Sequence, residues 1–290
     1  MTMRIVLSPN PYRDRGLKAA QSAQKILSQV GIKTSICLPF DLDAGSKVEL
    51  PKHLTYEKMD QVLPGADMLI CFGGDGTILH AAKDADAYGV PILGVNMGSV
   101  GFMAELEYGE LSLLNKLAEG KFETESRMML DVSVIREGKQ VFHEEALNDA
   151  ALTKGAVARV VDLKISCDNM PMSEFSADGV VVSTPTGSTG YSMSAGGPIV
   201  EPTAENLIIT PICAHAMDAK SFVLSSERIV SIRLGRLVRK TAYLSADGGR
   251  AFRLQDGDVV EIKKSNNVTK LVRISGRTFY EILAKKFGRT

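Results

Sequence analysis

The chain has 290 residues, of which 44% are hydrophobic and 23% charged, an ordinary globular composition that excludes disordered and fibrous classes. Lys plus Arg and Asp plus Glu number 34 each, so no net charge attracts nucleic acid or an anionic membrane, and any anion site must be built locally. The sequence has neither a secretion-signal pattern at its start nor a stretch of about 18 apolar residues. We therefore expect a cytoplasmic protein without nucleic-acid or membrane partners.

Four cysteines are scattered along the chain at Cys37, Cys71, Cys167 and Cys213, without a CxxC pair. All but Cys167 lie inside apolar runs. This pattern predicts buried free thiols rather than a disulfide framework or a zinc site.

Strand-like and helix-like patterns alternate over the first third of the chain. Short runs of strand-like composition, most of them apolar, predict strands at residues 4–8, 33–38, 67–72 and 91–95. Mixed apolar and polar segments predict helices at 15–29, 78–88 and 111–120. Alternating strands and helices are typical of a parallel sheet with right-handed crossovers. The sequence therefore predicts a Rossmann-like α/β domain at residues 1–122.

After about residue 120, apolar residues recur with a period of two, as at 130–134 and 161–167. Turn-forming residues predict turns at 137–138, 168–171, 255–258 and 265–267. These patterns predict an all-β, sandwich-like domain at residues 123–277. The last segment, 278–290, is basic and helical in pattern, and we expect it to return to the first domain.

A glycine-rich segment, Gly73-Gly74-Asp75-Gly76-Thr77, joins the third predicted strand to the next helix, which Thr77 is expected to cap. Backbone N–H groups at such a helix start bind phosphate, and glycine lets the phosphate approach closely. The negative charge of an aspartate in such a turn repels phosphate. Its presence is explained if the aspartate binds Mg²⁺ or accepts a proton from an attacking hydroxyl. The alternative is a tight turn with Asp75 as the helix cap. The segment is neither a Walker A loop nor a GxGxxG fingerprint.

Two further segments are candidate binding loops. Asn96–Phe102 follows the fourth predicted strand, at the edge where parallel sheets bind ligands. Asp178–Pro198 continues a predicted strand into a stretch rich in Gly, Ser and Thr, which we expect to lack regular structure. Its hydroxyls and amides suit ribose and phosphate oxygens, and Tyr191 offers a ring on which a base can stack. The alternatives are a glycine-rich connection for the first segment and a mobile surface loop for the second.

Four motifs in this order, Gly73–Thr77, Asn96–Phe102, Ala146–Asp149 and Asp178–Pro198, resemble those of the NAD kinase family, and the resemblance covers nearly the whole chain. It implies an α/β domain, a β-rich domain and a cleft between them. It also implies transfer of the γ-phosphoryl of ATP, or of polyphosphate, to the 2′-hydroxyl of the adenosine ribose of NAD, giving NADP. Mg²⁺ would accompany the phosphoryl donor, and a homodimer or homotetramer is expected.

Carried over by position, the resemblance makes Asp75 the catalytic acid–base group. The positions that it assigns to NAD or nucleotide binding are Gly73, Gly74, Asp75, Gly76, His80, Asn148, Asp149, Arg159, Asp178, Thr189, Gly190, Tyr191 and Ser194. His80 and Ser176 stand where the family often has a basic residue, and Lys220 stands near a family arginine.

Several of these positions have a simpler interpretation. Asn148-Asp149 suits an adenine edge and a ribose hydroxyl, but also a turn between strands. Arg159 is either a ligand contact or a solvated strand residue, and His80 is either a ligand contact or an ordinary surface side chain. Asp247-Gly248-Gly249 is either a site-lining segment or a hairpin turn.

Two other functions fit parts of the sequence. Diacylglycerol-kinase-like enzymes share the Gly-Gly-Asp-Gly-Thr turn, but they would show a different segment in place of Asn96–Phe102 and have no reason for Asn148-Asp149. A nucleotide-binding sensor without catalysis would gain nothing from Asp75 beside phosphate. We therefore favour a kinase acting on NAD.

Overall fold

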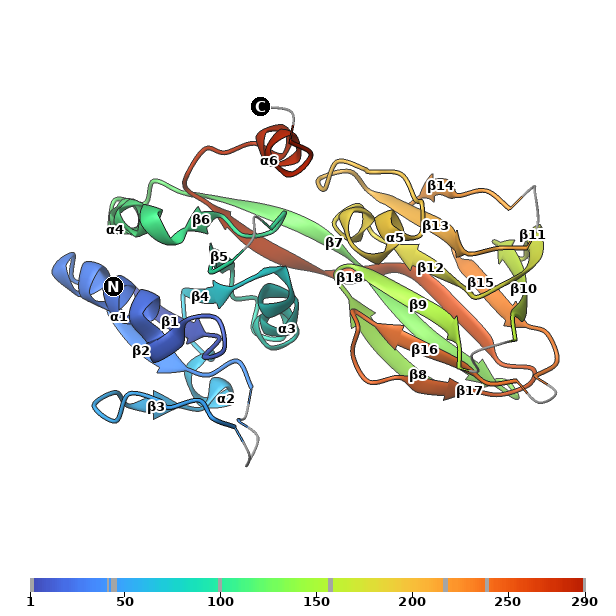
Figure 1. The fold of residues 1–290 in the computed structure, drawn as a ribbon, viewed down its shortest axis with the longest axis horizontal. Coiled ribbons are helices and arrows are strands. Elements are labelled where there is room, and N and C mark those ends of the chain that lie inside the picture. The colour runs from blue at the N-terminus through green and yellow to red at the C-terminus, as the bar shows by residue number, and fades with distance from the viewer. Residues whose placement is uncertain are drawn as a thin grey trace. The chain divides into compact units, whose positions relative to one another are not determined.

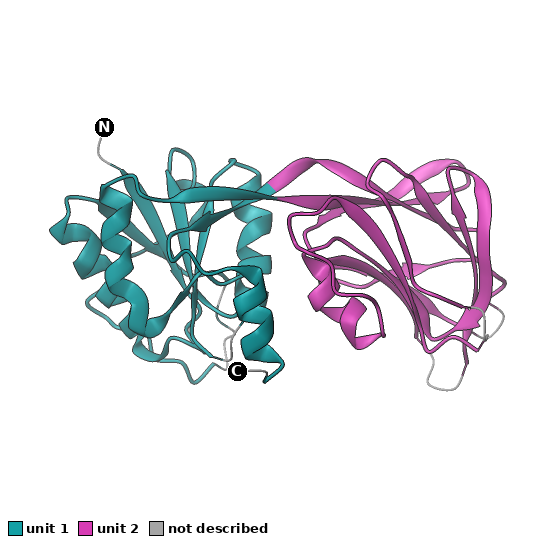
Figure 2. Cartoon of the chain, turned by 90° about the horizontal axis from the view of Figure 1, so that it is seen from above, with its two compact units in different colours: residues 1–126, 269–290 teal, residues 127–268 magenta. Residues whose placement is uncertain are grey.

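The computed structural model describes residues 3–40, 42, 46–98, 101–155, 159–215, 219–237 and 240–288. The chain forms two compact units, shown in Figure 2: unit 1 contains residues 1–126 and 269–290, and unit 2 contains residues 127–268. Both passages of the chain between the units fall inside long strands rather than in loops. The domain boundaries expected from composition, at 122/123 and 277/278, stay a prediction. Among the described residues, no helix is long and apolar enough to cross a membrane.

Unit 1 is built on a mainly parallel sheet (Figure 1). Its strands are β1 (Arg4–Pro9), β2 (Lys33–Cys37), β3 (Tyr56–Glu57), β4 (Met68–Gly73), β5 (Ile92–Asn96) and β6 (Leu106–Glu107). Its helices are η1 (Arg15–Leu17), α1 (Lys18–Gln29), α2 (Met59–Val62), α3 (Asp75–Asp86), η2 (Tyr108–Leu114), α4 (Asn115–Ala118) and α6 (Phe279–Lys286). The four strands predicted from apolar runs are confirmed as β1, β2, β4 and β5, and β3 was not predicted.

The strand order of this sheet is β3-β2-β1-β4-β5, with every pair parallel. This is the doubly wound order, in which the connections reverse direction between β1 and β4. All of β4 is buried, as expected for a strand covered on both faces. Helix α1 packs with η2 and α4, whereas α3 packs against β4 and β5. The reversal leaves the carboxyl ends of β1 and β4 open to a ligand.

Unit 2 is a sandwich of two antiparallel sheets. Its strands are β7 (Glu123–Arg136), β8 (Lys139–Ala146), β9 (Asp149–Lys154), β10 (Val161–Cys167), β11 (Met170–Ala177), β12 (Gly179–Ser183), β13 (Asn206–Ile212), β14 (Phe222–Ser225), β15 (Val230–Leu234), β16 (Ala242–Ala246), β17 (Phe252–Leu254) and β18 (Val259–Arg273). One sheet has the order β14-β13-β12-β9-β16-β17, and the other contains β7, β8, β10, β11, β15 and β18. Buried aliphatic side chains from both sheets form one core, as the period of two predicts.

Three local predictions about secondary structure are wrong. The predicted turn at 265–267 lies inside β18, which runs unbroken from residue 259 to residue 273. The turn after β10 uses only Asp168 and Asn169, both with positive φ, so Met170 and Pro171 already belong to β11. The glycine-rich stretch after β12 contains two short helices, η3 (Gly187–Thr189) and α5 (Tyr191–Ser194).

Two predictions about single residues are also wrong. Helix α3 begins at Asp75, so Gly74 is its N-cap and Thr77 lies in its first turn, where its hydroxyl accepts a hydrogen bond from Asn10. Cys37 and Cys71 are buried as predicted, but Cys213 is exposed. Cys213 lies just beyond the end of β13 with φ of +47°, so it has left the buried strand whose apolar pattern it continues.

Candidate active site

The glycine turn lies at the point where the connections of the parallel sheet reverse. Asn10 follows β1, and its backbone N–H donates to the carbonyl of Phe72 on β4 at 2.9 Å. The Asn10 side-chain amide donates to the Thr77 hydroxyl at 3.2 Å. The first turn of α3 is therefore tied to the end of β1, at the edge where ligands bind in sheets of this order.

The glycines of this turn have different roles. A Cβ on Gly73 would lie 2.2 Å from the Thr77 hydroxyl, so packing within the turn requires glycine there. A Cβ on Gly74 or Gly76 would meet nothing within 4 Å. Glycine at these two positions leaves open space in front of the first N–H groups of α3. The Thr77 N–H donates to the Gly74 carbonyl at 2.9 Å, but the N–H groups that precede it at a helix start have no partner within the helix, and this is the arrangement that binds phosphate.

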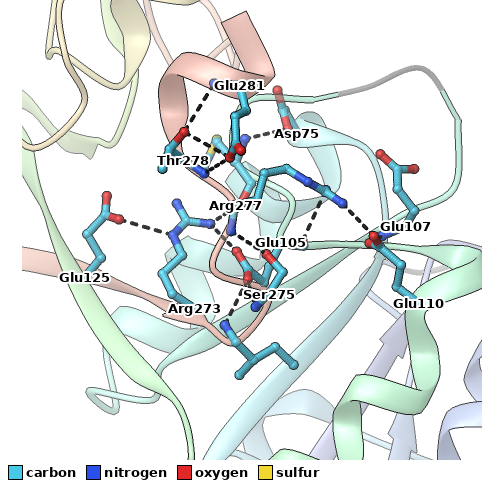
Figure 3. Close-up of polar contacts among 12 residues, drawn as sticks. Asp75, Glu105, Glu107, Glu110, Glu125, Arg273, Ser275, Arg277, Thr278 and Glu281 are labelled. Carbon is cyan, nitrogen blue, oxygen red and sulfur yellow. Dashed lines mark hydrogen bonds and ion pairs between the residues drawn. The ribbon is translucent and has the colours of Figure 1, made fainter. Parts of the chain in front are cut away.

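Asp75 is the first residue of α3, and backbone groups hold both of its carboxylate oxygens. Figure 3 shows one of these contacts as a dashed line at Asp75. The N–H of Phe102 donates to Oδ2 at 2.8 Å, and the N–H of Met103 donates to Oδ1 at 3.1 Å. Gly101 passes so close that a Cβ there would lie 2.1 Å from Oδ1. The carboxylate is half-buried and fixed, and each oxygen retains capacity to accept another hydrogen bond.

The segment predicted as the second binding loop thus provides the groups that hold Asp75. Asn96, the last residue of β5, donates from its side chain to the carbonyl of Gly98 at 3.2 Å and to Glu107 Oε2 at 2.9 Å. Ser99 and Val100 lie outside the described residues. The described part of the segment is therefore a support for the carboxylate as well as a candidate ligand contact.

In unit 2, Asn148 and Asp149 lie where the chain bends into β9, and a third residue holds their backbone N–H groups. The Asp247 carboxylate accepts hydrogen bonds from the backbone N–H groups of Leu147 at 2.7 Å, Asn148 at 2.7 Å and Asp149 at 3.0 Å. Asp247 lies at a positive-φ position followed by a glycine in the hairpin between β16 and β17. Asp247 is therefore both a hairpin-turn residue and a residue that holds the backbone of the candidate site at 147–149.

Asp149 and Asn148 differ from ordinary turn residues in their surroundings. Burial, with a smaller contribution from the nearby Asp247 carboxylate, raises the pKa of Asp149 to about 7. The side-chain oxygen of Asn148 is buried and has no hydrogen-bond partner among the described residues. Buried polar atoms are rarely left unpaired, so this acceptor marks a place where a ligand can donate a hydrogen bond.

The segment after β12 packs directly on this turn. The Thr184 hydroxyl donates to the Leu147 carbonyl at 2.6 Å, and a Cβ on Gly187 would lie only 2.0 Å from the Asn148 carbonyl. A Cβ on Gly190 would lie 3.6 Å from the Asn148 amide nitrogen and 3.9 Å from Asp149 Oδ2. The structure therefore brings Asn148, Asp149 and Gly190 together, although they lie far apart in the sequence.

Other predicted site residues border this group. Tyr191 follows Gly190 and is 42% exposed; burial of its hydroxyl and the Asp149 charge raise its pKa. Thr189 donates to the Thr186 carbonyl at 3.2 Å, and Ser194, at the end of α5, is exposed. Asp178, which lies between β11 and β12, pairs with Lys154 at 2.5 Å.

Two predicted site residues, Arg159 and His80, lie at exposed positions. Arg159 is exposed and precedes β10, so it is not the strand residue that the sequence suggested. His80 is exposed on α3, and its ring stacks on that of Phe40 with the centroids 6.0 Å apart. Ser176, where a basic residue was expected, donates to Asp162 at 2.5 Å.

Sequence reasoning missed the residues that support Asp75. Gly101 lies in the segment 96–102, which was predicted to bind ligand rather than to support Asp75, and Glu105 and Arg273 had no local signal. Arg273 donates to Glu105 across 168 residues of chain, so no periodic pattern relates them. An Asp followed by two glycines did mark Asp247, but its hydrogen bonds to residues 147–149 depend on strand pairing.

Comparison with known families and proteins gives a consistent result. Residues 17–122 match the family described as the ATP-NAD kinase N-terminal domain, and residues 147–274 match the ATP-NAD kinase C-terminal domain. The chain is 43% identical to an NAD kinase of Natranaerobius thermophilus, with 98% of each chain covered. It is 34% identical to an NAD kinase of Acetivibrio thermocellus, with 98% of this chain and 96% of the relative covered.

Two solved structures have a similar fold. A crystal structure of yeast NADH kinase complexed with NADH has a TM-score of 0.82 at 23% identity, covering 99% of this chain and 88% of that one. A crystal structure of an NAD kinase from Archaeoglobus fulgidus in complex with ATP has a TM-score of 0.72 at 23% identity, covering 99% of this chain and 100% of that one. The predicted fold, an α/β domain and a β-rich domain with a terminal helix in the first, is confirmed.

Proposed function

This chain belongs to the NAD kinase family and is therefore an enzyme that phosphorylates NAD, and we propose that it transfers the γ-phosphoryl group of ATP to the 2′-hydroxyl of the adenosine ribose, giving NADP. The observation that carries this assignment is the fixed carboxylate of Asp75 at the start of α3, beside glycines that leave room for phosphate. Because the chain belongs to this family, we no longer favour the two alternative functions, a diacylglycerol-kinase-like enzyme and a nucleotide-binding sensor without catalysis. The homo-oligomer, the cytoplasmic location and the use of polyphosphate stay predictions.

In the proposed reaction, Asp75 accepts the proton of the 2′-hydroxyl while that oxygen attacks the γ-phosphorus. The bond between the γ-phosphorus and the bridging oxygen breaks, and ADP leaves with the bond electrons. The proton on Asp75 is then released to water. The N–H groups of Phe102 and Met103 support this role, because they hold the carboxylate in one orientation and leave each oxygen able to accept from a substrate.

The phosphates of the donor would lie at the N-terminus of α3, against the N–H groups beside Gly74 and Gly76. The described residues include no group of three or more His, Cys, Asp or Glu that could hold a metal ion. A Mg²⁺ ion that enters with the nucleotide would need few ligands from the protein, and the Asp75 carboxylate would supply an oxygen of the kind that this ion prefers. When bound, the ion offsets the phosphate charge that the Asp75 carboxylate would otherwise repel.

Unit 2 supplies the proposed contacts to the adenosine of NAD. The unpaired side-chain oxygen of Asn148 suits the amino group of adenine, and the Asp149 carboxyl suits a ribose hydroxyl. The half-exposed ring of Tyr191 offers a face for the base. Gly190 lacks a side chain where one would reduce the space beside Asn148 and Asp149. The family resemblance also assigns ligand contacts to Asp178, Thr189, Ser194, His80 and Arg159, and we retain these five as proposed contacts.

The assignment is tested with NAD, ATP and Mg²⁺, using detection that is specific for NADP. Replacing the general base with Asp75→Asn should lower kcat by about 10²–10⁴-fold, because proton acceptance is lost, while KM for NAD changes little. Asp84→Asn, further along α3, is the matched control and should keep normal kcat. Near-normal turnover by Asp75→Asn would refute the general-base role. Absence of NADP with the wild-type enzyme, with ATP or polyphosphate as donor, would refute the proposed reaction.

A further inference from the structure

We propose that Arg273 and Glu105 form a positioning pair, which sets the orientation of Asp75 through the backbone of Phe102 and Met103. This inference rests on the proposed function of Asp75. Neither residue touches the reacting atoms in the proposed reaction. All five residues belong to unit 1, and Figure 3 shows Asp75, Arg273 and Glu105 within one connected set of polar contacts.

The connection from Arg273 to Asp75 passes through a single residue. Arg273 Nη1 donates to the carbonyl of Met103 at 3.3 Å, and the N–H of Met103 donates to Asp75 Oδ1 at 3.1 Å. Both backbone polar groups of Met103 are therefore held, one by the guanidinium and the other by the carboxylate. If Met103 shifted after the loss of Arg273, the N–H group that donates to the Asp75 carboxylate would move with it.

Glu105 fixes the other end of the same segment. Its backbone N–H donates to the Gly94 carbonyl on β5 at 2.9 Å, which anchors it to the sheet. Its carboxylate accepts from the N–H groups of Ile274 at 2.8 Å and Ser275 at 2.5 Å, and from Arg273 Nη1 at 3.2 Å. The chain after β18 is thereby joined to the segment that holds Asp75.

The burial of this pair is the feature that favours a positioning role. Only 3% of the Glu105 side chain and 18% of the Arg273 side chain are exposed. Buried ion pairs contribute little net stability, because desolvation offsets their attraction, and apolar residues of similar volume often serve as well. What such a pair does supply is a fixed geometry, because the planar guanidinium directs several donors at once. Here its donors reach Glu105, Met103 and, through Nε at 3.1 Å, Glu125.

Arg273→Met is the decisive variant, because it keeps much of the side-chain volume and removes all the donors. We expect kcat per folded molecule to fall about 10- to 100-fold, the effect of a misplaced catalytic group, with KM for NAD within about twofold of wild type. Arg273→Lys should keep more of the stability but recover only part of kcat, because one ammonium cannot reach Glu105 and Met103 in the same geometry. Glu105→Gln should also lower kcat.

Arg136→Met is the matched control. Arg136 pairs with the buried Asp258 through two hydrogen bonds of 2.8 Å in unit 2, so this variant also breaks a buried arginine–carboxylate pair. It should lower stability without lowering kcat per folded molecule. If Arg273→Met behaves like this control, the Arg273–Glu105 pair is only structural.

Amide hydrogen exchange provides a readout that does not depend on activity. In Arg273→Met and Glu105→Gln, exchange at Phe102 and Met103 should accelerate about tenfold or more, while the amides of β4 stay protected as in wild type. Unchanged protection of Phe102 and Met103 overturns the proposal, whatever the activity. If wild type forms no NADP, the proposed function of the chain fails on its own, and the exchange result still decides whether the pair holds this segment.

Discussion

Asp149 is a buried carboxyl group whose pKa is raised from its ordinary value of 3.8 to about 7, mainly because burial disfavours the charged form. In the unfolded chain the group ionises near its ordinary value. As the pH rises from about 4 to about 7, the unfolded state therefore loses a proton that the folded state keeps. The contribution of Asp149 to stability falls across this window and is constant above about pH 7.

Asp149→Asn should remove this dependence on pH. The stability of the variant relative to wild type should rise between pH 4 and pH 8, by at most about 4 kcal/mol, which corresponds to the full pKa difference. Urea unfolding at four pH values in this range measures the change. Glu261→Gln, at an exposed position of β18, should show no comparable trend. A constant difference between Asp149→Asn and wild type across the range would contradict a raised pKa.

Gly101 provides a second test at the scale of one residue. A Cβ at this position would lie 2.1 Å from Asp75 Oδ1, so Gly101→Ala must displace the carboxylate from the N–H groups that hold it. We expect kcat to fall about 10²-fold, because a displacement of about 1 Å at a catalytic group has effects of this size. Gly109→Ala, where a Cβ would meet nothing within 4 Å, should leave kcat unchanged. Normal kcat in Gly101→Ala would show that Asp75 can act from another position.

Helix α6 begins at a capping residue, Thr278, whose contribution to stability can be tested. The Thr278 hydroxyl accepts from the N–H of Glu281 at 3.3 Å, and the Glu281 carboxylate accepts from the N–H of Thr278 at 2.7 Å, which forms a capping box. The helix contacts the segment that holds Asp75, because the ring of Phe279 packs against that of Phe102 with the centroids 6.0 Å apart.

Thr278→Ala should therefore lower the free energy of unfolding by about 1 kcal/mol, the usual effect of losing an N-cap side chain. Thr278→Ser keeps the hydroxyl and should recover most of this loss. Denaturant unfolding of the three proteins measures the difference. If alanine and serine are equally stable, the capping box contributes nothing in solution.

The parts of the fold that were predictable are those where the pattern is local. Strands β1, β4 and β5 are largely apolar and buried because both faces are covered, and the period of two in unit 2 follows from one buried face per strand. The turn predicted at 265–267 failed because its polar side chains have a partner in another strand. Asn267 donates to both oxygens of Glu145 on β8, at 3.1 and 3.0 Å, and Ser265 also donates to Glu145. These side-chain hydrogen bonds to β8, together with the pairing of β18 with β7, override the turn preference of Ser and Asn.

The candidate site also contains residues that a local motif predicts and residues that only the tertiary structure reveals. Asp75 and Asn148-Asp149 are found from the sequence because each lies in a short motif with unusual chemistry. Their supports, Gly101 and Asp247 among them, depend on which loops the strand order brings together. Asp247 contacts a backbone N–H 100 residues earlier in the chain, so only the pairing of β9 with β16 reveals its role.

At the scale of the whole molecule, each unit has its own core, but unit 2 is one continuous segment of the chain whereas unit 1 consists of two segments. The core of unit 2 is drawn from one continuous stretch, residues 127–268. The core of unit 1 needs the last part of the chain as well, because Val272 and Ile274 are 0% and 5% exposed within it. Leu271 also pairs with Ile92 beside the parallel sheet. Unit 1 is therefore complete only after the end of the chain has been added.

A chain that stops after Val268 should accordingly keep unit 2 folded and lose unit 1. Removing the two buried side chains, at about 2–5 kcal/mol each for such truncations, together with Arg273, removes much of the 5–15 kcal/mol that a domain usually has. Hydrogen exchange followed by mass spectrometry should show protected peptides from β9, β12 and β13 but unprotected peptides from β1, β4 and β5. A chain that stops after Gly288 retains α6 and should be protected throughout. Protection of β1, β4 and β5 in the shorter chain would mean that residues 269–290 are dispensable for the parallel sheet, and that the buried contacts of Arg273 contribute to the placement of Asp75 alone.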